Sequence, residues 1–169
     1  MKILLASENH YPSYGGPYTV VSQTAKYLFL NNIEFKIIFK SNARIKYKHH
    51  FKEIIKDFDI VHIFGIWQPW LSKIFYTAKK LNKKTIISPL GALEPWALQQ
   101  KKLKKKLAWE IYQKNILKKA DYIHATSPAE KIHVEELKIK TPIKVLPHGI
   151  EIQNKNYMRN NLLKKAIFF

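Results

Sequence analysis

Two adjacent glycines followed by a proline, Gly15, Gly16 and Pro17, are the first residues along the chain whose types suggest binding chemistry. Glycine lets the backbone approach a ligand closely, and proline fits the first turn of a helix because it has no N–H to leave unpaired. A helix beginning here would point N–H groups and a positive dipole end at an anion such as a phosphate. A plain tight turn is the alternative. The spacing is neither G-x-G-x-x-G nor a P-loop, which argues against a nicotinamide enzyme.

An apolar segment at 59–64 contains a histidine, His62, and is followed by Trp67. A histidine in such a segment is either a hydrogen-bonded core residue or a group that acts on a substrate. Its place near the end of a predicted strand favours a role in a site. Trp67 either forms an apolar wall for a substrate or packs in the core.

Two loops farther along the chain combine turn residues with polar side chains. The first contains Gly91, Glu94 and Trp96, and it is either the edge of a pocket or a rigid loop before a helix. The second contains Ser127 and Glu130, which have the spacing of a capping box with a proline directly after the serine.

The sequence contains no pattern typical of a metal site. It has no cysteine, its seven histidines are scattered, and no H-E-x-x-H segment occurs. No serine–histidine–aspartate set or carboxylate pair stands out either. We therefore expect no metal and no bound cofactor.

A lysine-rich segment stands out in a chain whose formal net charge is +18. Leu103, Leu107 and Ile111 recur on one helical face among these lysines, which is typical of a basic amphipathic helix on an anionic membrane surface. A solvated charged face is the alternative. The chain has only two arginines, which argues against a protein that reads nucleic-acid bases through guanidinium contacts.

The candidate residues follow apolar segments that alternate with amphipathic ones. Strands are predicted at 2–7, 34–39, 59–64, 84–88, 121–126 and 143–150. Helices are predicted after the glycine pair, at 49–58, 71–81 and 95–119, and from 128 onward. The alternation predicts an α/β fold, a doubly wound Rossmann-like parallel sheet with helices on both faces. Ligands of such sheets bind beyond the carboxyl ends of the strands.

The chain of 169 residues has the length of one domain. Its longest uncharged apolar segment, 60–72, is shorter than the roughly 20 residues of a membrane-spanning helix. The first residues lack the long apolar region of a secretory signal. We expect a soluble, cytoplasmic protein that the lysine-rich segment holds at the inner face of the membrane.

Five segments together resemble a known family. In chain order they are YPSYGGPYTVV, FDIVHIFGIW, SPLGALEPWALQQKKLKKKLAWEIYQ, ADYIHATSPAE and IKVLPHGIEI. They are similar to the N-terminal, acceptor-side domain of family-4-type glycosyltransferases with the GT-B fold. The resemblance implies one of two Rossmann-like domains that face a cleft. It also implies retaining, metal-independent transfer of a sugar from a nucleotide-sugar to a glycan or lipid-linked acceptor, in cell-envelope polysaccharide synthesis.

The resemblance places the glycine loop near the donor diphosphate and leaves the catalytic residues unassigned. The predicted substrate-binding residues are Gly15, Gly16, Pro17, His62, Trp67, Gly91, Glu94, Trp96, Ser127 and Glu130. The predicted membrane-facing residues are Lys101, Lys102, Lys104, Lys105 and Lys106. A non-catalytic basic Rossmann-like module that binds nucleic acid or an anionic surface is the alternative function.

Three positions depart from the family's pattern. Leu90 stands where many relatives have a histidine, Phe64 where a second histidine often follows the first, and His148 where an asparagine is usual. In those relatives the histidine at the position of Leu90 lies near the donor sugar, so that role is not carried over to this chain.

The domain boundary is expected near residue 150. Residues 1–150 would form the N-terminal domain, and 151–169 a linker and the truncated start of a missing donor-binding domain, so that this chain alone is inactive. Alternatively, the residues from Ala166 to Phe169 pack as a terminal strand on the first domain.

Overall fold

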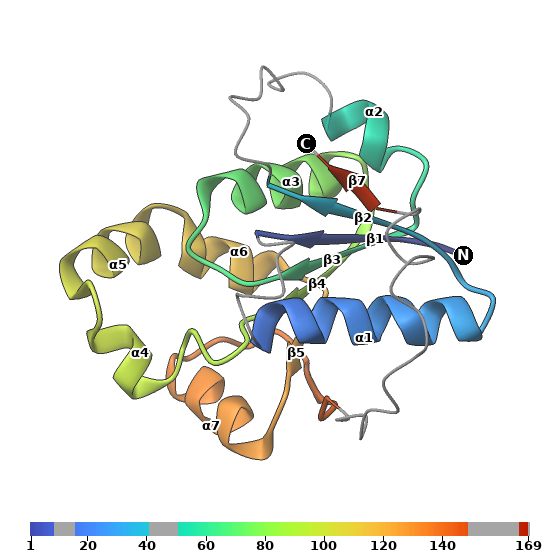
Figure 1. Ribbon diagram of the computed structural model, residues 1–169. Coiled ribbons are helices and arrows are strands. Elements are labelled where there is room, and N and C mark those ends of the chain that lie inside the picture. The colour runs from blue at the N-terminus through green and yellow to red at the C-terminus, as the bar shows by residue number, and fades with distance from the viewer. Residues whose placement is uncertain (9–15, 41–50, 149–165, 169) are drawn as a thin grey trace.

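A parallel sheet of seven strands forms the centre of the computed structural model, which describes residues 1–8, 16–40, 51–148 and 166–168 (Figure 1). The strand order is β6-β5-β4-β3-β1-β2-β7, and every neighbouring pair is parallel. The strands are β1 Lys2–Ser7, β2 Glu34–Phe39, β3 Ile60–Phe64, β4 Lys84–Ser88, β5 Tyr122–Ala125, β6 Ile143–Val145 and β7 Ala166–Phe168. The predicted doubly wound parallel sheet is confirmed.

The helices connect successive strands. They are α1 Gly16–Leu30, α2 Phe51–Ile55, α3 Pro69–Lys80, α4 Pro95–Gln99, α5 Lys102–Ala108, the π-helix η2 Trp109–Gln113, α6 Lys114–Lys119 and α7 Pro128–Glu136. The prediction of one helix over 95–119 is wrong, because the chain leaves the helical path at Gln100 and Lys101. Lys101 has a φ of 52°, in the left-handed region, so α4 and α5 are separate short helices.

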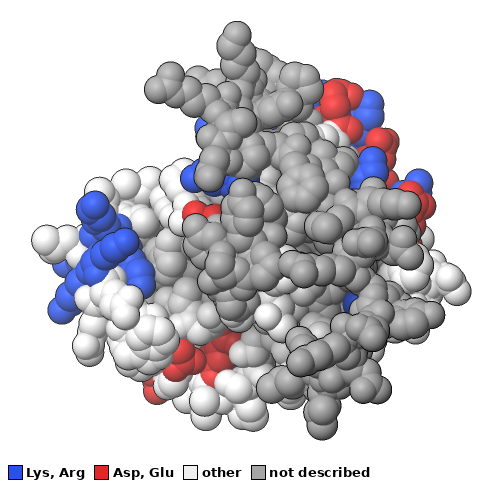
Figure 2. All heavy atoms as spheres, in the orientation of Figure 1, with Lys and Arg blue, Asp and Glu red and all other residues white. Residues whose placement is uncertain are grey.

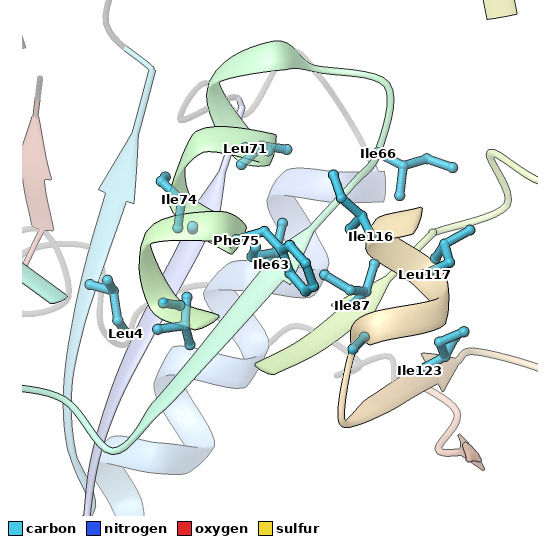
Figure 3. Packing of buried hydrophobic residues seen from close by; sticks show 14 of the residues in the cluster. Leu4, Ile63, Ile66, Leu71, Ile74, Phe75, Ile87, Ile116, Leu117 and Ile123 are labelled. Atoms are coloured by element: carbon cyan, nitrogen blue, oxygen red, sulfur yellow. The ribbon is translucent and has the colours of Figure 1, made fainter. Parts of the chain in front are cut away.

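Alternating residues of the strands fill two cores, one on each face of the sheet. Leu4 and Ala6 of β1 point to the larger core, where side chains of α3 and α6 pack on the strands (Figure 3). Ile3 and Leu5 point to the opposite face and pack with Val21 of α1. Each large side chain that is fully buried contributes about 1.5–3 kcal/mol, so these cores hold the loops at the sheet edge in place.

The strand order reverses at β1. Strands β3 to β6 lie on one side of it, and β2 and β7 on the other. At such a switch point the loops after β1 and β3 run to opposite faces and leave a crevice at the carboxyl edge, where ligands bind in sheets of this kind. Of the predicted substrate-binding residues, Trp67, Gly91, Glu94 and Ser127 lie in loops after the strands, whereas His62 lies within β3 and the other described ones lie in α1, α4 and α7.

The end of the chain returns to the sheet. Residues 166–168 form β7, which pairs with β2, in line with the alternative of a terminal strand on the first domain. Residues 151–165 of the predicted linker lie outside the described residues. Within the described part of the chain, no helix has the length and apolarity to cross a membrane.

Candidate functional site

Trp67, directly beyond β3, has a strained backbone. Its φ is 73°, in the left-handed region that non-glycine residues rarely adopt, which costs about 1–3 kcal/mol. Two adjacent side chains of η2 hold this conformation: the Trp67 N–H donates to Gln113 Oε1 at 3.0 Å, and the Tyr112 hydroxyl donates to the Trp67 carbonyl at 2.6 Å. Such bonds contribute about 0.5–1.5 kcal/mol each, so they roughly balance the strain.

The indole of Trp67 joins two further segments. Its Nε1–H donates to the Ala92 carbonyl at 3.3 Å, in the loop after β4. Lys105 Nζ lies 5.6 Å from the ring centroid and donates to the Ala97 carbonyl at 2.5 Å. Lys105 therefore turns inward, unlike the membrane-facing position predicted for it. Trp67 connects the carboxyl edges of β3 and β4 to α5 and η2.

His62 belongs to a chain of hydrogen bonds that crosses three strands. Its Nε2 lies 2.7 Å from Ser88 Oγ, which lies 2.8 Å from His124 Nδ1, and His124 Nε2 lies 2.9 Å from the Leu146 carbonyl oxygen. We call these residues the His62–Ser88–His124 relay. Burial, with smaller contributions from His124 and His148, lowers the pKa of His62 to about 3, so His62 is neutral at physiological pH.

The partners fix the direction of each bond in the neutral relay. The Leu146 carbonyl only accepts, so the neutral His124 carries its proton on Nε2 and accepts at Nδ1. The single Ser88 proton is then donated to His124, and Ser88 Oγ accepts from the Nε2–H of His62. His62 is thus a hydrogen-bonded residue that ties β3 to β4 and β5, and a role in substrate binding stays a prediction.

The relay borders a groove of about 540 Å³ between α1 and the sheet. His62, His124 and His148 contribute to its wall, opposite Tyr27 and Leu28 of α1. Burial also lowers the pKa of His148, which stands where the resemblance would place an asparagine. The imidazoles therefore place polar ring nitrogens at the wall of a mainly apolar groove.

Glu130 joins the loops after β4 and β5. Its side chain is buried, and Oε1 accepts from the Gly91 N–H at 2.7 Å. Oε2 accepts from the N–H of Thr126 at 2.7 Å and from its hydroxyl at 2.8 Å. Ser127 Oγ accepts from the Glu130 N–H at 3.1 Å, as the capping-box spacing predicts. The carboxylate is thus used within the fold, where it sets the position of the Gly91 turn.

Glu94 and Trp96, the remaining predicted residues after β4, differ in exposure. Glu94 Oε2 is 2.6 Å from His133 Nδ1, although not at a hydrogen-bond angle. Trp96, in α4, is 63% exposed. Glu94 faces α7, whereas the Trp96 indole is open to a partner.

Gly16 is the first residue of α1, and Pro17 is the second. A Cβ added to Gly16 would meet no atom of the described residues within 4 Å. Packing within the described residues therefore gives no reason for a glycine here, and both a tight turn and close approach of a ligand stay open. Gly15 lies outside the described residues.

The lysine-rich segment presents apolar side chains to solvent. Leu103, Leu107 and Ile111 are 84%, 63% and 66% exposed, and we call them the outward stripe. Lys101, Lys102, Lys104 and Lys106 are exposed around them, and Figure 2 shows the lysines gathered at the edge of the molecule formed by α5. Helix α5 buries none of its residues.

Two parts of the site were not predicted from the sequence. Nothing local marks Tyr112 and Gln113, since the residue they hold is more than forty positions away. For His124 the sequence does contain a signal, because it repeats the spacing found at His62. Asp59 precedes His62 by three positions and Asp121 precedes His124 by three positions, and each aspartate stands directly before a strand. Within the described ranges, no three histidine, aspartate or glutamate side chains gather as a metal site.

Comparisons with known proteins bear on the family and the fold. The family model of glycosyltransferase family 4 matches residues 10–154. Among solved structures, Anabaena Alr3699/HepE in complex with UDP-glucose is similar with a TM-score of 0.57 and 13% identity, over 90% of this chain and 45% of that chain. Homoserine dehydrogenase of S. aureus is similar over 65% of this chain and 31% of that chain, with 18% identity and a TM-score of only 0.32. No curated protein sequence matches.

Proposed function

The chain belongs to glycosyltransferase family 4, and we propose that it is the acceptor-side half of an enzyme that transfers a sugar from a nucleotide-sugar. The acceptor would be a glycan or a lipid-linked glycan, and transfer would retain the anomeric configuration. The family match carries the proposal. The fold shared with HepE, a protein solved with UDP-glucose, supports a nucleotide-sugar as the donor.

The proposed roles follow the carboxyl edge of the sheet. The donor diphosphate would lie at the start of α1, where Gly16 leaves room and the helix dipole favours an anion. The loops after β3 and β4, with Trp67, Gly91 and Trp96, would form the acceptor side. His62 and Glu130 would support these loops through the bonds described above.

We propose that the enzyme acts at the cytoplasmic face of a membrane, in the synthesis of a cell-envelope polysaccharide. The net charge of +18 and the exposed lysines of α5 support a position near anionic lipid. The chain spans 45% of the HepE chain. We therefore propose that a second domain supplies the donor-binding wall and that the 169 residues alone transfer little sugar.

A transfer assay tests the proposal on the protein that contains this chain together with a second domain. Labelled UDP- and GDP-sugars are offered with lipid-linked acceptors. Gly16→Val should abolish transfer and leave thermal unfolding unchanged, because the added side chain points into open space. Gly16→Ala, which adds only a methyl group, is the control for the size of the added side chain. Binding of no nucleotide-sugar would overturn the enzymatic proposal, and full transfer by Gly16→Val would overturn the role of the glycine.

A further inference from the structure

We propose that an anionic bilayer binds the outward stripe and thereby stabilises α5 and η2. This binding in turn holds the loop between β3 and α3, which contains Trp67, in its conformation at the edge of the site. The inference rests on the proposed function, since it concerns regulation of that site. It assigns two tasks to one segment, 102–113, whose opposite sides face solvent and Trp67.

The outer side fits a lipid surface. Leu103 and Leu107 lie one helical turn apart and more than half exposed, with Lys104 and Lys106 beside them. Apolar side chains that enter the acyl boundary, next to cations that meet headgroup phosphates, are the pattern of an interfacial helix. A second copy of this chain would bring lysines against lysines, and a nucleic acid would leave the stripe exposed.

The inner side holds the site. Lys105 reaches the Trp67 ring, while Tyr112 and Gln113 bond to the Trp67 carbonyl and N–H. These three residues lie on the same continuous helical segment as the stripe, and η2 directly follows α5. Any change in the order of this segment therefore reaches the Trp67 backbone through direct contacts.

The coupling follows from how weakly α5 is held. It buries no residue, and a left-handed residue, Lys101, interrupts the chain before it. A segment with so little buried surface opens locally more readily than the core. Lipid that binds only the helical form stabilises that form. The strained Trp67 conformation depends on bonds from the same segment, so lipid stabilises that conformation too.

Vesicle flotation of the 169-residue chain tests the surface. Vesicles of phosphatidylcholine with phosphatidylglycerol should bind it, less so as salt rises, and pure phosphatidylcholine vesicles should bind weakly. Lys104→Gln with Lys106→Gln should weaken binding about 30-fold, whereas Lys118→Gln with Lys119→Gln, on α6, removes the same charge without this loss. Leu103→Asn with Leu107→Asn should also lose binding, but Ile132→Asn on α7 should not. Equal losses in the control variants would overturn the docking surface.

Hydrogen exchange at the Trp67 amide tests the coupling. Anionic vesicles should slow this exchange in the wild type and leave it unchanged in Leu103→Asn with Leu107→Asn. Tyr112→Phe keeps the stripe, so it should still bind vesicles, but the slowing at Trp67 should shrink. Slowing confined to 102–113 would overturn the coupling. Neither measurement requires sugar transfer, so a failed transfer assay and a failed coupling are distinguishable.

Discussion

Glu130→Ala provides a direct test of how the two loops at the sheet edge are joined. The Glu130 side chain is only 2% exposed and accepts from the Gly91 N–H, the Thr126 N–H and the Thr126 hydroxyl. Hydrogen bonds to a charged group contribute about 1.5–3 kcal/mol each, but contributions within one cluster are not additive. The donor residues, Gly91 and Thr126, are half-buried, so water replaces part of the bonding that the variant loses. We therefore expect a loss of about 3–4 kcal/mol in the free energy of unfolding.

Urea unfolding followed by circular dichroism measures this loss. In a chain of this size it corresponds to a fall of roughly 10 °C in the melting temperature. Glu130→Gln should lose about half as much, because one amide oxygen still accepts. Glu135→Gln, on the same helix but exposed, should change stability by less than about 0.5 kcal/mol. A loss below about 1 kcal/mol in Glu130→Ala would refute the reasoning.

Three further predictions concern pH and backbone strain. The folded pKa of His62 is about 3, below its ordinary 6.5. Its contribution to stability is therefore full above pH 6.5 and falls by up to about 1.4 kcal/mol per pH unit as the pH drops toward 3. In urea titrations at several pH values, His62→Gln should flatten this dependence of stability on pH, and an unchanged dependence would contradict the prediction. Burial raises the pKa of Asp121, but hydrogen bonds from Lys79, Thr85 and Lys84 outweigh it and hold the pKa well below the ordinary 3.8; its contribution is therefore present above about pH 4 and lost below, and Asp121→Asn should lower stability at pH 7 but not at the acid end. Lys138 follows α7 with a φ of 56°, so Lys138→Gly should raise the free energy of unfolding by about 0.5–1 kcal/mol, and a decrease in a urea titration would count against it.

The sheet and its helices could be predicted from the sequence because the apolar patterns are local. The predicted range of strand β1 matches the observed one. The loops that contain Trp67 and Gly91 are expected at the carboxyl edge because each directly follows a predicted strand along the chain. The break at Lys101 could not be predicted, because lysine is a good helix former and no glycine or proline marks a turn at residues 97–106.

The site was harder to predict than the fold because its bonds join distant positions. The spacing of Ser127 and Glu130 predicts the helix cap. It does not predict that the Glu130 carboxylate also accepts from the Gly91 N–H. The same holds for Ser88, whose two histidine partners come from different strands. Sequence spacing indicates which residues share a helix, and it does not indicate which strands become neighbours.

The direction of the His62–Ser88–His124 relay has a consequence for proton movement. Every hydrogen in it points from His62 toward the Leu146 carbonyl, which has no proton of its own to pass on. A proton taken up by His62 would therefore pass no farther than His124. The bonds tie β3, β4 and β5 together and do not conduct a proton beyond them.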